Sequence, residues 1–149
     1  MKETDSKDAP KIIWLLKAIA DQLLDITLNH YEEKCAILFG KSKTDIFRFD
    51  RIVEAENVLH SPTHFEIDPE FVWHKFVENE KHYGDNMGMG IFHTHPPQQH
   101  TPSQLDFQFM RNWNVPWLIG SRNDKPGLKA YILLKDQIIE IQIHLFESK

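Results

Sequence analysis

The sequence feature that most constrains the fold is a pair of histidines at the end of an apolar segment, followed by a helix start. His93 and His95 are separated by one residue, and on a β-strand such residues project from the same face. After a loop, the run 101–104 is typical of a helix start, with Thr101 at the N-cap and Pro102 in the first helical position. The sequence therefore predicts a strand and a helix that meet at the two histidines.

Asp106 lies in the first turn of this expected helix, three residues after Ser103, so a hydroxyl and a carboxylate share one helix face. Taken singly, each residue has a structural explanation, since the helix dipole alone favours Asp in a first turn. Together, two imidazoles and one carboxylate suit zinc and leave a fourth tetrahedral position open. The pattern predicts a catalytic metal site at His93, His95 and Asp106, whereas His100 falls outside the spacing and is interpreted as solvated. Iron, cobalt or manganese would also fit these ligands in vitro.

Size and composition set the broad class. The chain has 149 residues, which suits one domain over residues 10–149 after a disordered tail at residues 1–9. The net charge is −5 and no block of Lys and Arg is present, which argues against nucleic acid and against an anionic membrane as partners. A single cysteine rules out an intrachain disulfide, and neither a signal peptide nor a long apolar run is visible. We therefore expect a cytoplasmic protein.

Hydrophobic periodicity predicts helices and strands in alternation, and hence an α/β or α+β class. The segment 12–16 is continuously apolar and fits either a buried strand or the first turns of a helix. One helix is expected at 17–29, a second after the cap Asp68 and Pro69 with Phe71, Val72, Trp73 and Phe76 inward, and a third that ends before Asn114. Strands are expected at 34–40, 45–54, 87–92, 115–119, 128–134 and 138–146.

A hydrolase built on such a metal site needs a carboxylate that takes a proton from water without being a ligand. Zinc lowers the pKa of a bound water to about 7, so a nearby base can generate the nucleophile at neutral pH. Glu33, at the entry to the strand expected at 34–40, is the candidate. Periodicity alone does not separate it from Glu32, Glu54 or Glu66.

Three patterns occur together in this chain. Glu33 lies seven residues before Gly40 in an apolar strand, and the motifs His93-x-His95-Pro96 and Ser103-x-x-Asp106 follow later in the sequence. The combination resembles the JAMM (MPN+) zinc metalloprotease family, which includes the proteasome-lid deubiquitinase, from about residue 12 to the C terminus. The resemblance implies one domain with a twisted, mostly antiparallel sheet flanked by helices. It implies one catalytic zinc held by His93, His95 and Asp106, a general base and proton shuttle at Glu33, and an oxyanion donor at Ser103.

The function that the resemblance implies is a zinc isopeptidase that cleaves after the Gly-Gly tail of ubiquitin or a ubiquitin-like modifier. The same chemistry on sulfur-carrier proteins or small peptide-like conjugates is one alternative. A RadC-like role in DNA repair is another, and the acidic composition argues against it. A scaffold without catalysis is disfavoured because all five positions are present. Oligomeric state, and dependence on a proteasome or another partner protein, stay open.

Four further expectations concern the site and its neighbourhood. Ala36 stands where the family usually has Gly, and its extra methyl is expected to be tolerated while narrowing the site. Cys35 is interpreted as a small buried hydrophobe rather than a nucleophile, and no second, structural zinc is expected. The glycines of the segment Met87 to Gly90 indicate either tight packing or a contact with the extended substrate tail.

Overall fold

The computed structural model describes residues 11–28, 32–95, 102–121 and 127–148. The tail predicted at residues 1–9, Thr101 and His100 lie outside these ranges. Within them the chain forms strands β1 (Ile12–Leu16), β2 (Cys35–Lys43), β3 (Ile46–Ala55), β4 (Met87–His95), β5 (Trp117–Ser121), β6 (Gly127–Leu134) and β7 (Gln137–Phe146). The helices are α2 (Lys17–Leu28), α3 (Pro69–Tyr83) and α4 (Gln104–Asn112), with the 3-10 turn η1 (Gly84–Asn86) after α3.

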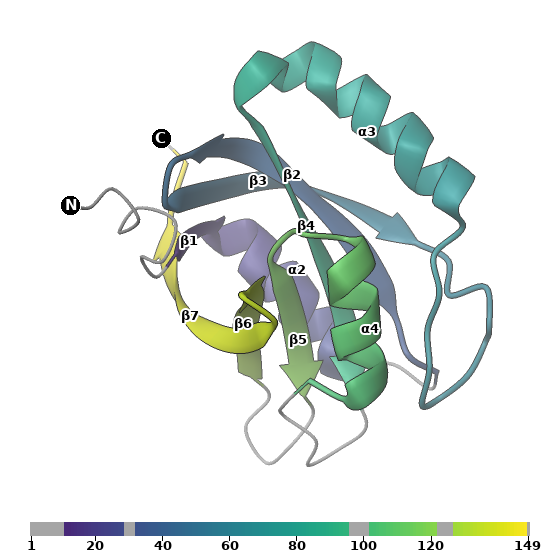
Figure 1. The fold of residues 1–149 in the computed structure, drawn as a ribbon. Coiled ribbons are helices and arrows are strands. Elements are labelled where there is room, and N and C mark those ends of the chain that lie inside the picture. The colour runs from purple at the N-terminus through teal and green to yellow at the C-terminus, as the bar shows by residue number, and fades with distance from the viewer. Residues whose placement is uncertain (1–10, 29–31, 96–101, 122–126, 149) are drawn as a thin grey trace.

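The strands form one mixed sheet that closes on itself, in the order β1-β3-β2-β4-β5-β6-β7 with β7 next to β1 (Figure 1). The pairs β2–β3, β2–β4, β5–β6 and β6–β7 are antiparallel, whereas β1 is parallel to both of its neighbours and β4 is parallel to β5. Helices lie on both faces. The α+β class predicted from the sequence is confirmed.

The segment that periodicity left open is a strand. In β1 Ile13 and Leu15 are buried while Trp14 between them is exposed, which is the alternation of a strand with one face inward. Helix α2 follows without a linker at Lys17 and buries Ile19 and Leu23. The predicted helix at 17–29 is therefore present over its described length.

Strand β2 is longer than predicted. Gly40 was expected to end the strand, yet β2 runs on to Lys43 and pairs with β3 along its whole length. The register shifts between Phe39 and Gly40, and a Cβ on Gly40 would lie 1.8 Å from the carbonyl oxygen of Arg48. The glycine therefore permits a β-bulge rather than terminating the strand.

The sheet buries two apolar clusters, one on each face. The α2 face packs against α2 through buried side chains that include Leu38, Phe92 and Leu118. The α4 face packs against α3 and α4 through residues that alternate with these, including Ile37, Ile91 and Ile119. Because strand side chains alternate, the three adjacent strands β2, β4 and β5 each contribute to both clusters.

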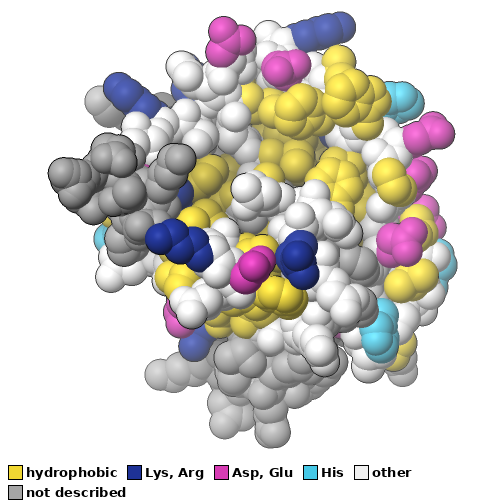
Figure 2. Space-filling view, viewed as in Figure 1, with side chains coloured by type: hydrophobic (Ala, Val, Ile, Leu, Met, Phe, Trp, Pro, Cys, Tyr) yellow, Lys and Arg dark blue, Asp and Glu magenta, His cyan; other side chains and the backbone are white. Residues whose placement is uncertain are grey.

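Helix α3 begins as predicted, but the side chain of Trp73 points outward and not inward. The Asp68 carboxylate accepts the backbone N–H of Glu70 at 3.1 Å, and Pro69 opens the helix. Val72 is buried, whereas Trp73, which was expected inward, is 62% exposed and stacks on Phe76. The exposed apolar side chains near α3 are visible at the top of the space-filling view (Figure 2).

The glycines of β4 are explained by packing inside the protein. A Cβ on Gly90 would lie 2.9 Å from the ring of Phe49, and one on Gly88 would lie 2.8 Å from the Cβ of Ser42. Met87 also begins the strand that ends at His95, so it lies at the far end from the two histidines. These contacts favour tight packing over a substrate contact at this segment.

Among the described residues, no helix is long and apolar enough to cross a membrane.

Candidate active site

Strand β4 brings the two histidines to the α4 face of the sheet. It lies between β2 and β5, with His93 opposite Cys35 on one side and Ile119 on the other. His93 and His95 are 0% and 2% exposed, and their ring centroids lie 4.7 Å apart. A strand paired on both sides thus holds both imidazoles on one face, as the His-x-His spacing predicts.

Helix α4 supplies the carboxylate through its first turn. The Ser103 Oγ accepts the N–H of Asp106 at 3.0 Å, and the Asp106 Oδ2 accepts the N–H of Ser103 at 2.8 Å. This reciprocal pair is a capping box, so the helix begins after Ser103 and not at Pro102 as predicted. The cap fixes the Asp106 carboxylate where both histidines reach it.

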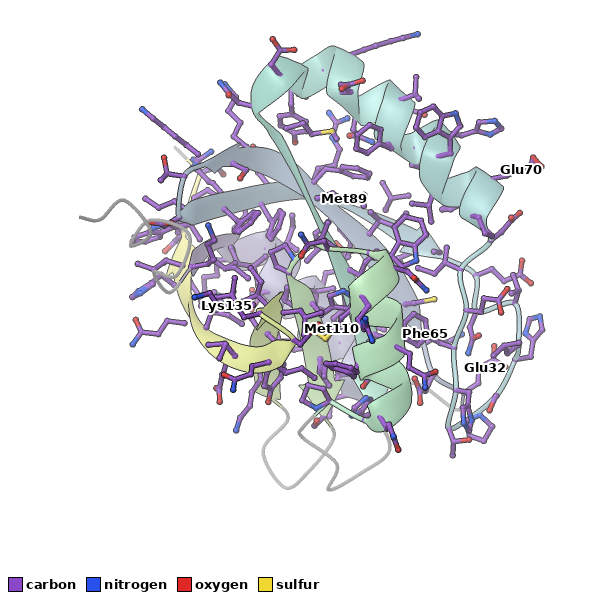
Figure 3. The ribbon with its side chains drawn as sticks, viewed as in Figure 1. Glu32, Phe65, Glu70, Met89, Met110 and Lys135 are labelled. Carbon is purple, nitrogen blue, oxygen red and sulfur yellow. The ribbon has the colours of Figure 1, made fainter. Side chains whose placement is uncertain are left out.

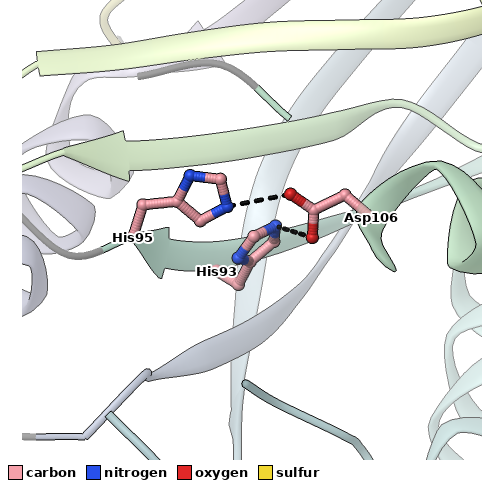
Figure 4. A group of neighbouring side chains, drawn as sticks. All are labelled: His93, His95 and Asp106. Atoms are coloured by element: carbon pink, nitrogen blue, oxygen red, sulfur yellow. Dashed lines mark hydrogen bonds and ion pairs between the residues drawn. The ribbon is translucent and has the colours of Figure 1, made fainter. Parts of the chain in front are cut away.

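Both imidazoles face Asp106 with the same nitrogen. The Nε2 of His95 lies 2.8 Å from Oδ2 and the Nε2 of His93 lies 3.3 Å from Oδ1 (Figure 4). Burial by itself raises the pKa of Asp106, but the hydrogen bond with His95, the charge of His93 and the N–H of Ser103 together lower that pKa below its usual value. Asp106 is therefore an anion at neutral pH, as a metal ligand must be.

Glu33 lies beside this group, just before β2. Its side chain is buried, and its Oε1 is 3.4 Å from the Nδ1 of His93. The N–H of Lys34 donates to the Thr94 Oγ1 at 2.9 Å, and the N–H of Thr94 donates to the carbonyl oxygen of Lys34 at 3.0 Å. These bonds continue the β2–β4 ladder toward Glu33 and hold it against the histidine strand.

The other three glutamates considered from the sequence lie elsewhere. Glu32 pairs with His60 at 3.2 Å, the Glu54 carboxylate accepts from the Gln22 side chain at 3.4 Å, and the Glu66 side chain is exposed. Geometry thus separates Glu33 from Glu32, Glu54 and Glu66, which periodicity did not.

The first two residues of β2, Cys35 and Ala36, face opposite sides of the sheet. Ala36 packs in the cluster of the α2 face, so its methyl points away from the histidines and does not narrow the site as expected. Cys35 is buried on the α4 face and its thiol donates to the carbonyl oxygen of Ala55 at 3.5 Å. Burial, and then the charge of Glu33, raise the pKa of the Cys35 thiol to about 12. A thiol of this kind is protonated at neutral pH and is not a nucleophile.

Two aromatic rings that the sequence analysis missed enclose His93. The ring of Phe65 stacks on His93 with centroids 4.4 Å apart, and Trp117 meets the same imidazole edge-on at 5.8 Å. Figure 3 shows Phe65 next to α4, on the loop that precedes α3. No periodic signal marks this loop, so only its spatial position reveals the contact.

A cavity of about 310 Å³ opens at the site. Glu33, His95, Ser103 and Asp106 line it together with residues 63–65 of the loop before α3. Phe65 also lines a second, smaller cavity between α3 and the end of α4, whose walls include Trp113 and Trp117. The polar site and this apolar cavity therefore share one ring as their common wall.

The three residues fit a divalent metal ion. Among the described residues, His93, His95 and Asp106 form a group whose ligand atoms all lie within 4.8 Å of one another. The Nε2 of His93 is buried and, among the described residues, forms no hydrogen bond, although it lies 3.3 Å from the Asp106 Oδ1 as an ion pair. A buried nitrogen of this kind costs free energy unless it meets a partner such as a metal, and the donor set of two His and one Asp suits zinc.

Comparisons with known proteins identify the family of the chain. The family of prokaryotic homologues of the JAB domain matches residues 15–133. A desampylase from Pyrococcus furiosus is 36% identical over 123 residues, which are 81% of this chain and 81% of the relative. A Desulfitobacterium hafniense protein known from a solution structure is 28% identical, with a TM-score of 0.77 over 91% of this chain and 94% of that one.

The family match covers most of the chain, including both histidines, Asp106 and Glu33. The resemblance to JAMM (MPN+) proteins noted from the sequence thus agrees with a relative that shares more than a third of the aligned residues. This chain belongs to the JAB-domain (JAMM/MPN-type) family, among its prokaryotic members.

Proposed function

We propose that this protein is a zinc-dependent isopeptidase that cleaves the bond after the C-terminal Gly-Gly tail of a ubiquitin-like modifier. The observation that carries the proposal is the buried meeting of His93, His95 and Asp106 with a further carboxylate, Glu33, at 3.4 Å from His93. The relative named desampylase supports a protein modifier as the substrate. We assign the activity to one domain over residues 10–149, in the cytoplasm.

In this proposal His93, His95 and Asp106 hold the metal ion. When bound, zinc acts as a Lewis acid that polarises the carbonyl of the scissile bond and lowers the pKa of a water molecule. The Asp106 carboxylate is kept in place by the N–H of Ser103 at 2.8 Å. Such support for a ligand is typical of metal sites, because it orients the ligand before the metal arrives.

Glu33 is the general base and then the general acid. Its carboxylate is buried and lines the cavity at the site, so a water molecule bound in that cavity would lie within its reach. It takes one proton from the attacking water and returns it to the leaving amine, which leaves Glu33 unchanged after each cycle. Burial excludes bulk water and so keeps this proton transfer within the site.

Ser103 donates a hydrogen bond to the developing oxyanion. Its Oγ already accepts the N–H of Asp106 at 3.0 Å, and the hydroxyl hydrogen stays available to donate to another acceptor. Ser103 lines the same cavity as Glu33. A donor fixed in this way contributes most in the transition state, where charge builds up on the oxygen.

The test is cleavage of a ubiquitin-like protein joined through its Gly-Gly tail to a reporter. We expect native enzyme to cleave after the second glycine, chelator to abolish cleavage and added zinc to restore it. A matched substrate in which the last glycine is replaced by valine should resist cleavage. Failure of zinc-loaded enzyme to cleave several such modifiers, or equal cleavage of the valine substrate, would contradict the proposed substrate.

A further inference from the structure

The buried side-chain amide of Asn57, which is not one of the proposed metal ligands, links two segments of the site through hydrogen bonds. Asn57 lies in the loop between β3 and α3 and is 3% exposed. We infer that Asn57 is a positioning residue, which sets the place of the general base Glu33 and of the ring of Phe65 against His93. This inference rests on the proposed function, since it concerns the geometry of that reaction.

The side chain of Asn57 bonds to backbone groups on two segments. Its Nδ2 donates to the carbonyl oxygens of Glu33 at 2.8 Å and His64 at 2.9 Å, with that of Ser61 further off at 3.4 Å. Its Oδ1 accepts the N–H groups of Leu59 and Glu66, both at 3.1 Å. An amide has two N–H donors and one carbonyl acceptor with two lone pairs, and here all of them are used.

The backbone of Glu33 needs this support because it lies outside the sheet. Strand β2 begins at Cys35, two residues later. The N–H of Glu33 donates to the carbonyl oxygen of Ser61 at 2.8 Å, and its carbonyl oxygen accepts from Asn57. Both backbone groups of Glu33 are thus held by the loop, and this fixes the direction in which its carboxylate leaves the chain.

The same amide fixes Phe65. The two residues that flank it, His64 and Glu66, each bond to Asn57 through their backbones. The ring of Phe65 therefore has little freedom to leave its stack on His93, 4.4 Å away. A shift of the amide moves the base and the ring together, whereas His95 and Asp106 are held by their own strand and helix.

The experiment compares two buried asparagines. Asn57→Ser removes the amide at the site, and Asn79→Ser is the matched control, because Asn79 is also buried but bonds Arg51 and the carbonyl oxygen of Lys75 on α3. For each variant we would measure melting temperature, zinc content, kcat and KM. Both should lose thermal stability and keep their zinc.

The two variants should differ in catalysis. We expect Asn57→Ser to lower kcat by about tenfold to a hundredfold, since a shift of about 1 Å in a catalytic group has an effect of this size, with a smaller change in KM. Asn79→Ser should keep kcat within about twofold. In a Glu33→Gln background, Asn57→Ser should lower the residual rate little further, because the group that it positions is already inactive.

Three results would overturn the inference. They are a folded Asn57→Ser enzyme with native kcat, an equal loss of kcat in Asn79→Ser, or a full additional loss in the Glu33→Gln background. If wild-type enzyme cleaves no modifier, the proposed function fails first, and hydrogen exchange of the native protein then tests the positioning alone. The N–H groups of Leu59 and Glu66 should be protected together, and free exchange at both would contradict the role of Asn57 even if Asn57→Ser does not fold.

Discussion

The two faces of the same strands differ in what they bury. On the α2 face, β2, β4 and β5 bury apolar side chains such as Leu38, Phe92 and Leu118, with the uncharged Thr94 near the end of β4. On the α4 face, the apolar cluster gives way to Glu33 and His93 where β2 begins and β4 ends. One residue of offset along a strand thus separates a stabilising core from a chemical site.

This difference indicates how the fold supports the site. Buried carboxylates and imidazoles are costly in free energy unless paired, whereas burial of a large apolar side chain contributes about 1.5–3 kcal/mol. The apolar burial on the α2 face therefore stabilises the fold and offsets the free-energy cost of burying charged groups on the α4 face. Substitutions on the two faces should separate stability from activity.

The largest effect is expected at a metal ligand. Asp106→Asn keeps an oxygen for the N–H of Ser103 but removes the negative charge that faces both imidazoles. We expect loss of bound zinc and a fall in kcat/KM of at least about a thousandfold, since the metal contributes several kcal/mol to the transition state. Metal analysis and the cleavage assay check this. A zinc-loaded, active Asp106→Asn enzyme would contradict the assignment of the chemical site to the α4 face.

Next in size is a cavity on the opposite face. Leu38 is fully buried in the cluster of the α2 face, and Leu38→Ala should cost about 3 kcal/mol of unfolding free energy. Because its side chain points away from the histidines, kcat at low temperature should stay within about twofold of wild type. Urea denaturation and steady-state kinetics measure the two quantities, and a large fall in kcat of the folded variant would show that the faces are not separate.

A smaller effect is expected where α2 approaches the sheet. A Cβ on Gly120 would lie 2.1 Å from the Thr27 Oγ1 and about 3 Å from the ring of Phe92. Gly120→Ala should cost about 2 kcal/mol through overpacking. In a Thr27→Ala background the cost should shrink, because the nearest atom is gone. Strict additivity of the two changes in denaturation experiments would mean that this contact does not set the spacing of α2.

The smallest effect is expected at the end of α3, far from the metal ligands. The Tyr83 hydroxyl donates to the Asp50 carboxylate, and burial, followed by that bond, raises the pKa of Tyr83 to about 12. Tyr83→Phe should cost about 1 kcal/mol. A pKa raised above its usual value of about 10 stabilises the fold fully below pH 10, so the difference between wild type and variant should fade as pH rises from 10 to 12. A difference independent of pH across that range would contradict this assignment.

The sequence predicts the parts of the site that depend on short-range patterns. The spacing of His93 and His95 is local, and so is the signal for a helix just before Asp106, although the cap is Ser103 and not the predicted Thr101. Most strands and helices also follow from periodicity. The grouping of His93, His95 and Asp106 was therefore predictable from the sequence, and their role as metal ligands is part of the proposed function.

The remainder depends on contacts between distant segments. Asn57 and Phe65 lie in a loop without periodicity, and their roles follow from bonds to Glu33 and a stack on His93. Closure of the sheet requires β1 to pair in parallel with β7, which no local pattern encodes. Trp73 was misjudged because helical periodicity indicates an apolar face but not its edges, and its ring lies on the exposed edge.

The central claim is that Glu33 carries the proton while His93, His95 and Asp106 hold the metal. The most direct test measures zinc content and cleavage of a Gly-Gly-linked ubiquitin-like protein by Glu33→Gln, beside wild type. The account predicts one zinc per chain in both proteins and a kcat lowered about 10²–10⁴-fold in the variant, the usual contribution of a general acid and base. An unchanged kcat, or loss of zinc from Glu33→Gln, would contradict it.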